Sequence, residues 1–369
     1  MLIMNKYFRG TASMVYMMTN NEVMNQIIAF YRDMNGMLTF VGAYPTYGKG
    51  TGTKEVSTAT ANDGVDPLTA QGALTLSRDG RFLLAVNAGS HSISSFIITD
   101  SGTPILVDVK PSGGAQPNSV DVFGNLVYVS NVGNPENNFT SNITGFLIDN
   151  IGRLTPFPRS THSLSTFNAQ PAQVLFTPDG SKILVTELTS NHLSIFHVNK
   201  NGMVTGPIVN DSYGQGPLGA YFLSSGILLV TEADSNALSS YSMSKDGILH
   251  VISGSVPNGY KTACWVVPTK DERFAYVTNT LSGTISTYRI DPNGALSVVR
   301  HITSTPPSTS PGLPMDVGVS KDGRHFYTLN GNQGTVSVFT IQDDGSLVRL
   351  QVAAWTNIPY LGSQGLTIL

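Results

Sequence analysis

Short apolar runs alternate with polar turns along the whole chain, and none keeps the 3.6-residue period of an amphipathic helix. The segment "KILVTELTSNHLSIF" (182–196) is representative, because two runs rich in β-branched and aromatic residues flank a polar turn. Related segments occupy residues 18–31, 85–96, 129–146, 230–241, 277–288 and 328–339. We therefore expect each to form a strand, a turn and a second strand, and we expect almost no helix.

Two further markers extend each segment to a four-stranded unit. A turn residue and a glycine follow every copy; these glycines are Gly36, Gly102, Gly152, Gly202, Gly247, Gly294 and Gly345. Before the copies, stretches such as "SRDGRFLLAV" and "TPDGSKILVT" place Asp-Gly between two β-like runs, which indicates a tight hairpin because the turn requires positive φ. A unit of four short strands that recurs about every 45–50 residues is the signature of a β-propeller.

The unit occurs seven times, and the two ends of the chain complement each other. The first copy enters at "SMVYMMTN" without an innermost strand, whereas the last residues, "SQGLTIL", match the innermost strand "AQGALTLS" of the second copy. We expect an all-β, seven-bladed propeller with four antiparallel strands per blade, closed by the C-terminal strand in the N-terminal blade, since closure removes exposed sheet edges. Residues 1–369 then form one domain, with blades at about 12–45 plus 363–369, 68–112, 116–162, 170–212, 217–258, 262–304 and 313–355.

The connections differ between the two faces of such a ring. If the strands of a blade are named A to D from the axis outward, the A–B and C–D turns share one face and are nearly all tight. The B–C turns and D–A connections share the other face, which receives the long excursions 44–71, 134–142, 159–171 and 304–314. Function tends to reside on loops held by a rigid scaffold, so we expect a site on this loop-rich face; simple capping of the ring is the alternative.

The polar residues that end the B strands are expected to surround the mouth of the channel. In blade order they are Asn20, Asn87, Asn131, Glu187, Glu232, Asn279 and Asn330. The amides could simply satisfy backbone groups. Glu187 and Glu232, on neighbouring blades, could hold a metal or polar ligand, or repel each other until one acts as a proton donor. A solvated or paired acid is the alternative for each. Among the histidines, His162 is the best candidate for acid–base work.

The composition of the chain limits the kinds of binding partner and the cellular compartment that we expect. The formal net charge is −3, charged residues make up 12%, and no Lys/Arg cluster suggests a nucleic-acid partner. No run approaches the ~18 apolar residues that span a bilayer, and the N-terminus lacks the apolar region of a signal peptide. We expect a cytoplasmic monomer without membrane contact, although the low charge would also suit a secreted or cell-surface protein. Cys264 stands in an apolar run, and no His-x-His spacing occurs, so no cofactor is required; a divalent cation at Glu187 and Glu232 stays open.

The blades resemble those of the seven-bladed lactonase family, whose members include proteins similar to 6-phosphogluconolactonase and carboxymuconate cyclase. The resemblance covers nearly the whole chain and rests on "PDGSKILVTEL", "KDERFAYVTNTLSGTISTYRIDPNGALSVV" and "KDGRHFYTLNGNQGTVSVFTIQDDGSL". It implies a propeller fold and hydrolysis or isomerisation of a lactone-type substrate.

The resemblance carries over only part of the family's site. The family's acid, in a "V-N-E-L" stretch that ends a B strand, corresponds to Glu187 in "VTEL". The family's Arg-His pair at the start of the preceding A strand is replaced by Ala172 and Gln173, and its further His and Arg are replaced by Asn118 and Asn279. Without these cationic groups an anionic lactone such as a phosphogluconolactone would lose its charge clamp, so the resemblance is that of a divergent member.

Two functions follow as hypotheses. In the first, a small polar, neutral or cationic ligand binds over the channel, with Glu187 as acid or base assisted by Glu232. The residues expected to orient that ligand are Asn118, Gln173, Asn279, Asn330, Gln71 and Gln364. In the second, the propeller is non-catalytic and presents loops 44–71 and 134–142 to a protein or glycan, with Tyr44, Tyr47 and Phe139 as contact aromatics.

Overall fold

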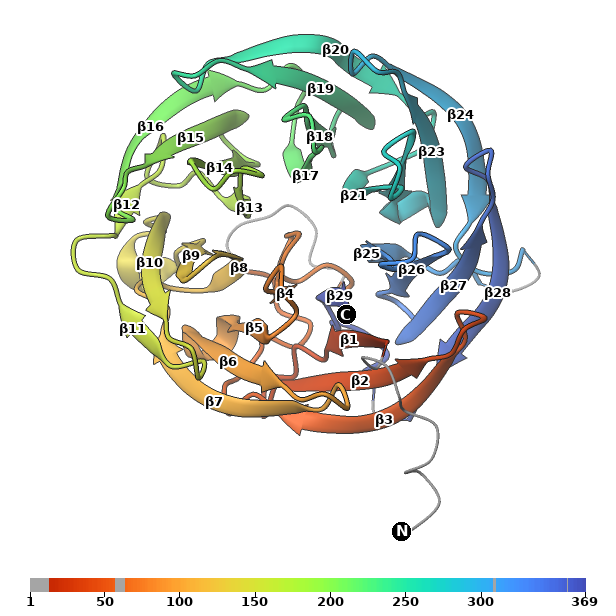
Figure 1. Cartoon of the computed structure of the whole chain (residues 1–369), viewed down its shortest axis with the longest axis horizontal. Helices are drawn as coiled ribbons and strands as arrows, with labels where there is room; N and C mark the ends of the chain where they lie inside the picture. Colours follow the sequence, from red (N-terminus) through yellow and green to blue (C-terminus); the bar gives the residue numbers. More distant parts are fainter. Residues whose placement is uncertain (1–12, 57–63, 308–309, 357) are drawn as a thin grey trace.

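Seven antiparallel sheets surround a central axis in the computed structural model of the chain, as Figure 1 shows. The structure describes residues 13–56, 64–307, 310–356 and 358–369. Within them the only helical segments are three short 3₁₀ turns, η1 (Ala88–Ser90), η2 (Pro135–Asn137) and η3 (Thr280–Ser282). The expected all-β, seven-bladed propeller is therefore confirmed.

Each blade contains strands A to D in order from the axis. Blade 1 consists of β29 (Leu366–Ile368), β1 (Met14–Met18), β2 (Gln26–Arg32) and β3 (Leu38–Pro45). Blade 2 consists of β4 (Leu74–Leu76), β5 (Phe82–Asn87), β6 (Ser92–Ile98) and β7 (Pro104–Pro111). Blade 3 consists of β8 (Pro117–Phe123), β9 (Leu126–Asn131), β10 (Asn142–Ile148), β11 (Leu154–Pro156) and the short β12 (His162–Ser163).

The remaining blades follow the same order. Blade 4 consists of β13 (Pro171–Phe176), β14 (Lys182–Glu187), β15 (His192–Val198) and β16 (Val204–Asp211). Blade 5 consists of β17 (Pro217–Phe222), β18 (Leu228–Glu232), β19 (Ala237–Met243) and β20 (Leu249–Pro257). Blade 6 consists of β21 (Ala263–Pro268), β22 (Phe274–Asn279), β23 (Thr284–Ile290) and β24 (Leu296–Thr303). Blade 7 consists of β25 (Pro314–Val319), β26 (His325–Asn330), β27 (Thr335–Ile341) and β28 (Leu347–Ala354).

The ring closes as the sequence predicts. The C-terminal strand β29 lies antiparallel to β1, with Met17 opposite Leu366 and Val15 opposite Ile368, and Figure 1 shows the two strands side by side near the axis. Strands from the two ends of the chain therefore share one sheet. The pairing covers the inner edge of β1, so blade 1 has the same four-strand order as the other blades.

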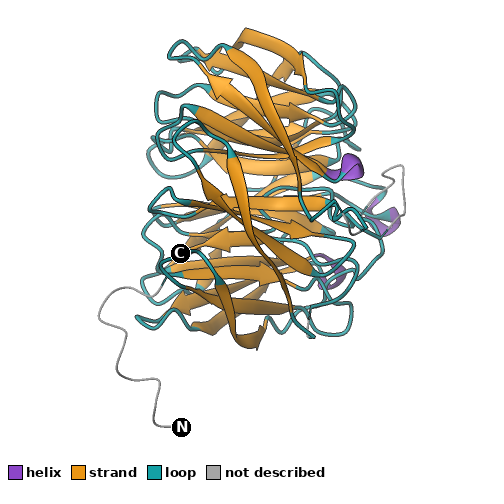
Figure 2. Ribbon diagram, turned by 90° about the vertical axis from the view of Figure 1, so that its right-hand side faces the viewer, coloured by secondary structure: helices purple, strands orange, loops and turns teal. Residues whose placement is uncertain are grey.

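The two faces of the disc carry different loops, as expected from the loop lengths in the sequence. Figure 2 shows the 3₁₀ turns together on one side of the disc, whereas the C-terminus lies toward the other. We call these sides the loop-rich face and the tight-turn face. Since blades pack sheet against sheet, most B-strand side chains face a neighbouring blade: β5 and β26 are buried at every position, whereas the outer strand β28 has exposed residues along its length.

The repeated glycine after each C strand marks a link between neighbouring blades. All seven have positive φ, between 78° and 89°, which suits glycine because it has no Cβ. Each carbonyl accepts a hydrogen bond from the preceding blade. The donors to Gly36, Gly102, Gly152, Gly202, Gly247, Gly294 and Gly345 are respectively Tyr327, Tyr16, Ser95, Tyr128, Asn210, Ser240 and Tyr276. The marker is therefore both a turn and a fixed acceptor between blades.

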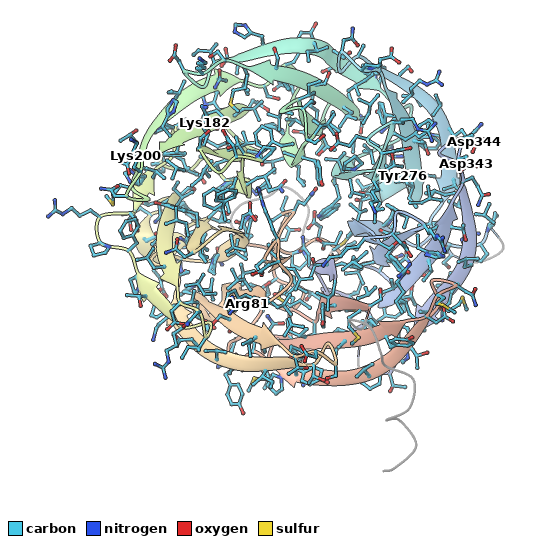
Figure 3. All side chains as sticks on the ribbon, viewed as in Figure 1. Arg81, Lys182, Lys200, Tyr276, Asp343 and Asp344 are labelled. Carbon is cyan, nitrogen blue, oxygen red and sulfur yellow. The ribbon has the colours of Figure 1, made fainter. Side chains whose placement is uncertain are left out.

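Loss of one such link should have a measurable cost. Tyr276, labelled in Figure 3, is fully buried, and its hydroxyl lies 3.0 Å from the carbonyl oxygen of Gly345. Tyr276→Phe leaves that buried carbonyl without this donor, so we expect it to lower the free energy of unfolding by about 1–3 kcal/mol in urea denaturation. Tyr360→Phe is the control, because Tyr360 is 68% exposed and its change should stay within about 0.5 kcal/mol. Equal effects would contradict the proposed role of the link.

Candidate functional site

The polar residues that end the B strands lie inside the blades, where none of the seven is exposed. Three of the amides share one arrangement: each donates to the hydroxyls five and seven residues ahead, on the neighbouring C strand. These donors are Asn87 to Ser92 and Ser94, Asn279 to Thr284 and Ser286, and Asn330 to Thr335 and Ser337. The side chains thus tie the B strand to the C strand within a blade.

Glu187 occupies the same position in blade 4, with a carboxylate in place of the amide. The hydroxyl of Ser194 donates to Oε1 at 2.5 Å, and that of Ser190 donates to Oε2 at 2.7 Å. Ser165, in the connection that precedes the blade, donates its hydroxyl to Oε2 and its backbone N–H to Oε1, the latter at 3.2 Å. Several donors on one carboxylate stabilise a buried charge.

Ser165 connects this buried carboxylate to partly exposed groups. Its Oγ lies 2.8 Å from Nδ1 of His192, at the start of β15, and Nε2 of His192 lies 3.5 Å from Oδ1 of Asp211 at the end of β16. The His192 side chain is 27% exposed, and Ser165 is also partly exposed. A carboxylate, a hydroxyl and an imidazole therefore form a continuous chain from the blade interior to the loop-rich face.

Glu232 is the equivalent residue of blade 5, and no histidine among the described residues is hydrogen-bonded to its carboxylate. Oε1 accepts from the backbone N–H of Gly214 at 2.9 Å and from the hydroxyl of Ser239 at 2.5 Å, and Oε2 accepts from the hydroxyl of Ser255. The expectation that Glu187 and Glu232 face one cavity at the channel mouth is wrong, because each carboxylate is buried against its own blade. Their catalytic and metal-binding roles stay predictions.

The amides expected to orient a ligand instead bind the chain itself. We call residues 65–71, the end of the long excursion from blade 1 to blade 2, the central segment. The side chain of Gln71 forms two hydrogen bonds of 3.1 Å with the backbone of Val266, in blade 6. Gln364 accepts from the N–H of Leu68 at 2.8 Å and donates to the carbonyl of Ala70 at 3.1 Å. These contacts hold the central segment against the inner strands.

Two further amides complete this arrangement. Asn118 donates to the carbonyls of Leu68 and Pro171, and Gln173 accepts from the N–H of Ala220 in the next blade at 2.6 Å. Both side chains are buried, Asn118 at 1% and Gln173 at 5% exposed. Their ligand-binding role stays a prediction, as it does for Asn279 and Asn330.

Apolar contacts also fix the central segment inside the ring. Val65 packs in one cluster with Trp265 and Met315, from the A strands of blades 6 and 7, and the indole Nε1 of Trp265 donates to the carbonyl of Ala70 at 3.1 Å. Figure 1 shows this part of the chain, just before β4, within the ring of A strands. The sequence predicted an exposed loop here, but its last residues fill the loop-rich end of the channel. Residues 57–63 of that loop lie outside the described residues.

Asp316 is a buried acid that the sequence analysis missed. It lies in β25 at a bulge, with φ of 24°, and its Oδ2 accepts from the backbone N–H of Gly365 at 2.6 Å. Burial raises the pKa of its carboxyl from 3.8 to about 7, since the charged form is poorly solvated there. The sequence around Asp316, Asp-x-Gly within an A strand, does not indicate this contact. The reason is that the partner lies in another blade, since the contact joins blade 7 to blade 1.

His162 lies away from the channel. It belongs to β12, which pairs with the C strand β10, and its ring centroid is 6.1 Å from that of Phe196. Burial lowers the pKa of its imidazole, and Nε2 is buried without a hydrogen-bond partner. An acid–base role for His162 stays a prediction.

Clefts of substantial volume occur on the opposite face from Glu187. Four clefts of about 350–500 Å³ lie between blades among the tight turns. Figure 3 labels Lys182, Asp343 and Arg81, which line three of them. Side-chain chemistry, and not cavity volume, therefore favours a site on the loop-rich face.

The described residues contain no group of three or more His, Cys, Asp or Glu side chains placed to hold a metal ion. Nor do they include a helix with the length and apolar character that crossing a bilayer requires. Cys264 is 1% exposed, and burial raises the pKa of its thiol.

Similarity to known proteins is strong in fold and limited in sequence. In curated sequences, 6-phosphogluconolactonases of Cronobacter sakazakii (strain ATCC BAA-894) and Klebsiella pneumoniae (strain 342) are 30% identical over 80 residues and 25% identical over 83 residues. These matches cover 21% and 22% of this chain and 24% and 25% of the relatives, so the chain aligns with about a quarter of their length.

Solved structures extend the likeness to nearly the whole chain. The periplasmic gluconolactonase of Pseudomonas aeruginosa superposes with a TM-score of 0.73 at 18% identity, covering 97% of this chain and 99% of that one. A protein from Lactobacillus plantarum superposes with a TM-score of 0.72, also at 18% identity and with the same coverage. At this identity the structures show the shared fold alone.

The family assignment comes from a sequence model of the whole family. The model described as "Lactonase, 7-bladed beta-propeller" matches residues 7–155 and 265–359, which is more than half of the chain. The chain therefore belongs to the lactonase family of seven-bladed β-propellers.

Proposed function

We propose that this propeller hydrolyses a small polar lactone, neutral or cationic, at the loop-rich face beside Glu187. The observation that carries the proposal is the hydrogen-bonded chain from Glu187 through Ser165 to His192. Glu187 also stands where the family's acid is expected, in "VTEL" at the end of a B strand. Family membership and a buried acid in contact with the surface together support lactone hydrolysis.

The substrate's charge is inferred from what has replaced the family's cationic groups. Ala172 and Gln173 occupy the Arg-His position, and both are buried, Ala172 in the apolar cluster with Trp265. Asn118 and Asn279 are likewise buried and hydrogen-bonded. These uncharged positions offer no clamp for a phosphate or carboxylate, which favours an uncharged or cationic lactone.

The central segment supports a site beside the channel in preference to one over it. Gln71, Gln364 and Asn118 already use their amides on residues 65–71 and their surroundings. Because Glu187 is fully buried, a proton that it gives or takes must pass through a neighbouring hydroxyl, and Ser165 is the partly exposed one. The reacting bond would then lie near Ser165 and His192.

Glu187→Gln tests this function. The carboxamide keeps nearly the same volume, and serine hydroxyls can reorient toward it, but it carries no charge and cannot accept a proton, so Ser165 loses its charged hydrogen-bond acceptor. We expect turnover of a panel of uncharged γ- and δ-lactones, followed as acid release, to fall by roughly 10²–10⁴-fold while circular dichroism stays unchanged.

Glu232→Gln is the matched control. It removes the equivalent buried carboxylate of the next blade, to which no histidine among the described residues is hydrogen-bonded, so we expect a much smaller loss of turnover than in Glu187→Gln. Retention of turnover in Glu187→Gln, or an equal loss in both variants, would contradict the assignment to Glu187.

An interaction role is the second candidate, favoured by exposed aromatic side chains on the loop-rich face. Tyr47 in the loop 44–71 is 68% exposed, whereas Tyr44 and Phe139 are partly buried. Such side chains commonly anchor interfaces. Under this alternative, a protein or glycan partner binds equally to the native chain and to Glu187→Gln, because the loops do not include that carboxylate.

A further inference from the structure

The hydroxyl of Ser165 lies between two groups that can accept its proton. It contacts Oε2 of Glu187 on the buried side and Nδ1 of His192, 2.8 Å away, on the partly exposed side. On the other side of the ring, Nε2 of His192 lies 3.5 Å from Oδ1 of Asp211, an ion-pair distance to a side chain that is 94% exposed. A hydroxyl in contact with a base is the contact from which covalent acyl transfer starts.

A second serine–histidine pair shows what is distinctive about the first. In blade 6, Oγ of Ser286 lies 3.0 Å from Nδ1 of His301, but Ser286 is fully buried and accepts from the amide of Asn279. In blade 6, therefore, the serine of the pair is hydrogen-bonded to an amide and is not exposed to solvent. Blade 4 has the contact together with a carboxylate and a partly exposed serine. The two pairs share the serine–histidine contact. They differ in the solvent exposure of the serine and in the presence of a neighbouring carboxylate.

We propose that Ser165 is the nucleophile of the hydrolysis, with His192 as the base that takes its proton. This inference rests on the proposed function and names the covalent step within it. His192 is preferred to Glu187 as the base because the imidazole is partly exposed and can return the proton to a leaving group, whereas the carboxylate is fully buried. At rest the Ser165 hydroxyl donates to Oε2 of Glu187, which holds Oγ in place; for the attack the hydroxyl turns to Nδ1 of His192, which must then carry no proton.

The step balances with water as the only co-reactant. An electron pair on Oγ of Ser165 forms a bond to the lactone carbonyl carbon while the hydroxyl proton moves to Nδ1 of His192. Collapse of the tetrahedral intermediate breaks the ring C–O bond, and the departing oxygen takes the proton from His192. Water then attacks the acyl-serine ester, gives one proton to His192, and releases the hydroxy acid as that proton returns to Oγ.

A biotinylated fluorophosphonate tests the nucleophile directly, since it reacts with activated serines by forming a P–O bond and releasing fluoride. We expect the native chain to gain one phosphonyl group, located by peptide mass spectrometry at Ser165. His192→Asn should slow the labelling by about 10²-fold or more. Ser286→Ala, which removes the serine of the second pair, should label at the native rate. No labelling of the folded chain, or labelling at another serine only, overturns the proposal.

Two more variants distinguish a failure of the nucleophile assignment from a failure of the proposed hydrolysis. Ser165→Ala should lose both the label and lactone turnover; if turnover survives there but is lost in Glu187→Gln, hydrolysis stands and the nucleophile is wrong. If Ser165→Ala fails to fold, Ser165→Cys replaces it, because the native Cys264 is buried and the new thiol can be followed with iodoacetamide. An alkylation rate for this thiol no faster than that of free cysteine would also overturn the proposal.

Discussion

A chain that lacks residues 364–369 is expected to lose its native fold and to accumulate as aggregate. These residues supply β29, whose pairing with β1 closes the ring (Figure 1), and Leu369 donates its backbone N–H to the carbonyl of Met14. Their removal exposes the edge of β1, and exposed edges pair with other chains. Gln364 would also release Leu68 and Ala70 of the central segment.

The size of this effect follows from the parts that are lost. Burial of a leucine side chain such as Leu366, which is 6% exposed, contributes about 2–5 kcal/mol. Each buried backbone group left unpaired costs about 1–3 kcal/mol. Together these losses approach the total stability of ordinary proteins, about 5–15 kcal/mol. Size-exclusion chromatography and circular dichroism of the truncated chain measure the outcome.

Point variants in the same strand provide the control. Leu366→Ala should destabilise the protein by about 2–5 kcal/mol, whereas Thr367→Ala, at a partly exposed position, should have a much smaller effect. A truncated chain that elutes like the native chain and unfolds at the native temperature would show that β29 does not close the ring.

Asp316→Asn is expected to stabilise the protein, increasingly so toward alkaline pH. Burial raises the folded-state pKa of Asp316 to about 7, well above the value of 3.8 for the free group. A raised pKa means that the folded chain binds the proton more tightly, so stability falls as pH rises from about 4 to about 7 and stays reduced above that. The carboxamide keeps an acceptor for the N–H of Gly365 without the charge.

The gain at about pH 8 could reach ~4 kcal/mol, since one pKa unit corresponds to about 1.4 kcal/mol. Urea denaturation at about pH 5 and about pH 8 measures it, and the difference between variant and native chain should grow between the two. Asp179→Asn should show the opposite sign, because hydrogen bonds from Thr177 and Ser181 lower the pKa of Asp179 to about 2 and make its charged form stabilising. An equal or unfavourable effect of Asp316→Asn at both pH values would contradict burial as the dominant influence.

The placement of Glu187 illustrates why the site was harder to predict than the fold. Its position at the end of a B strand follows from the repeat, but the direction of its side chain depends on the packing of the blade. The hydroxyl of Thr186 donates to the carbonyl of Leu218 in blade 5, whereas Glu187 bonds to Ser194 in its own blade and to Ser165. Successive side chains of a strand leave opposite faces of the sheet, and both faces of a blade meet other parts of the protein.

Ser165 and His192 could not be paired from the sequence for the same reason. They are 27 residues apart, in a connection and a C strand, and no motif links them. A weak signal existed, since His192 closely follows the "VTEL" stretch, but only the fold of blade 4 brings it to a serine and a carboxylate together.

Local information in the chain was enough for the architecture. Alternating apolar residues, Asp-Gly turns and a glycine after each C strand act over a few residues, so seven four-stranded units and the complementary C-terminal strand can be recognised from the sequence. The filling of the channel by residues 65–71 and the burial of Glu187, Glu232 and Asp316 depend on contacts between distant blades, such as Gln71 with Val266, 195 residues apart. Such contacts exist only once the ring has closed, because closure brings the A strands of all blades to a common axis.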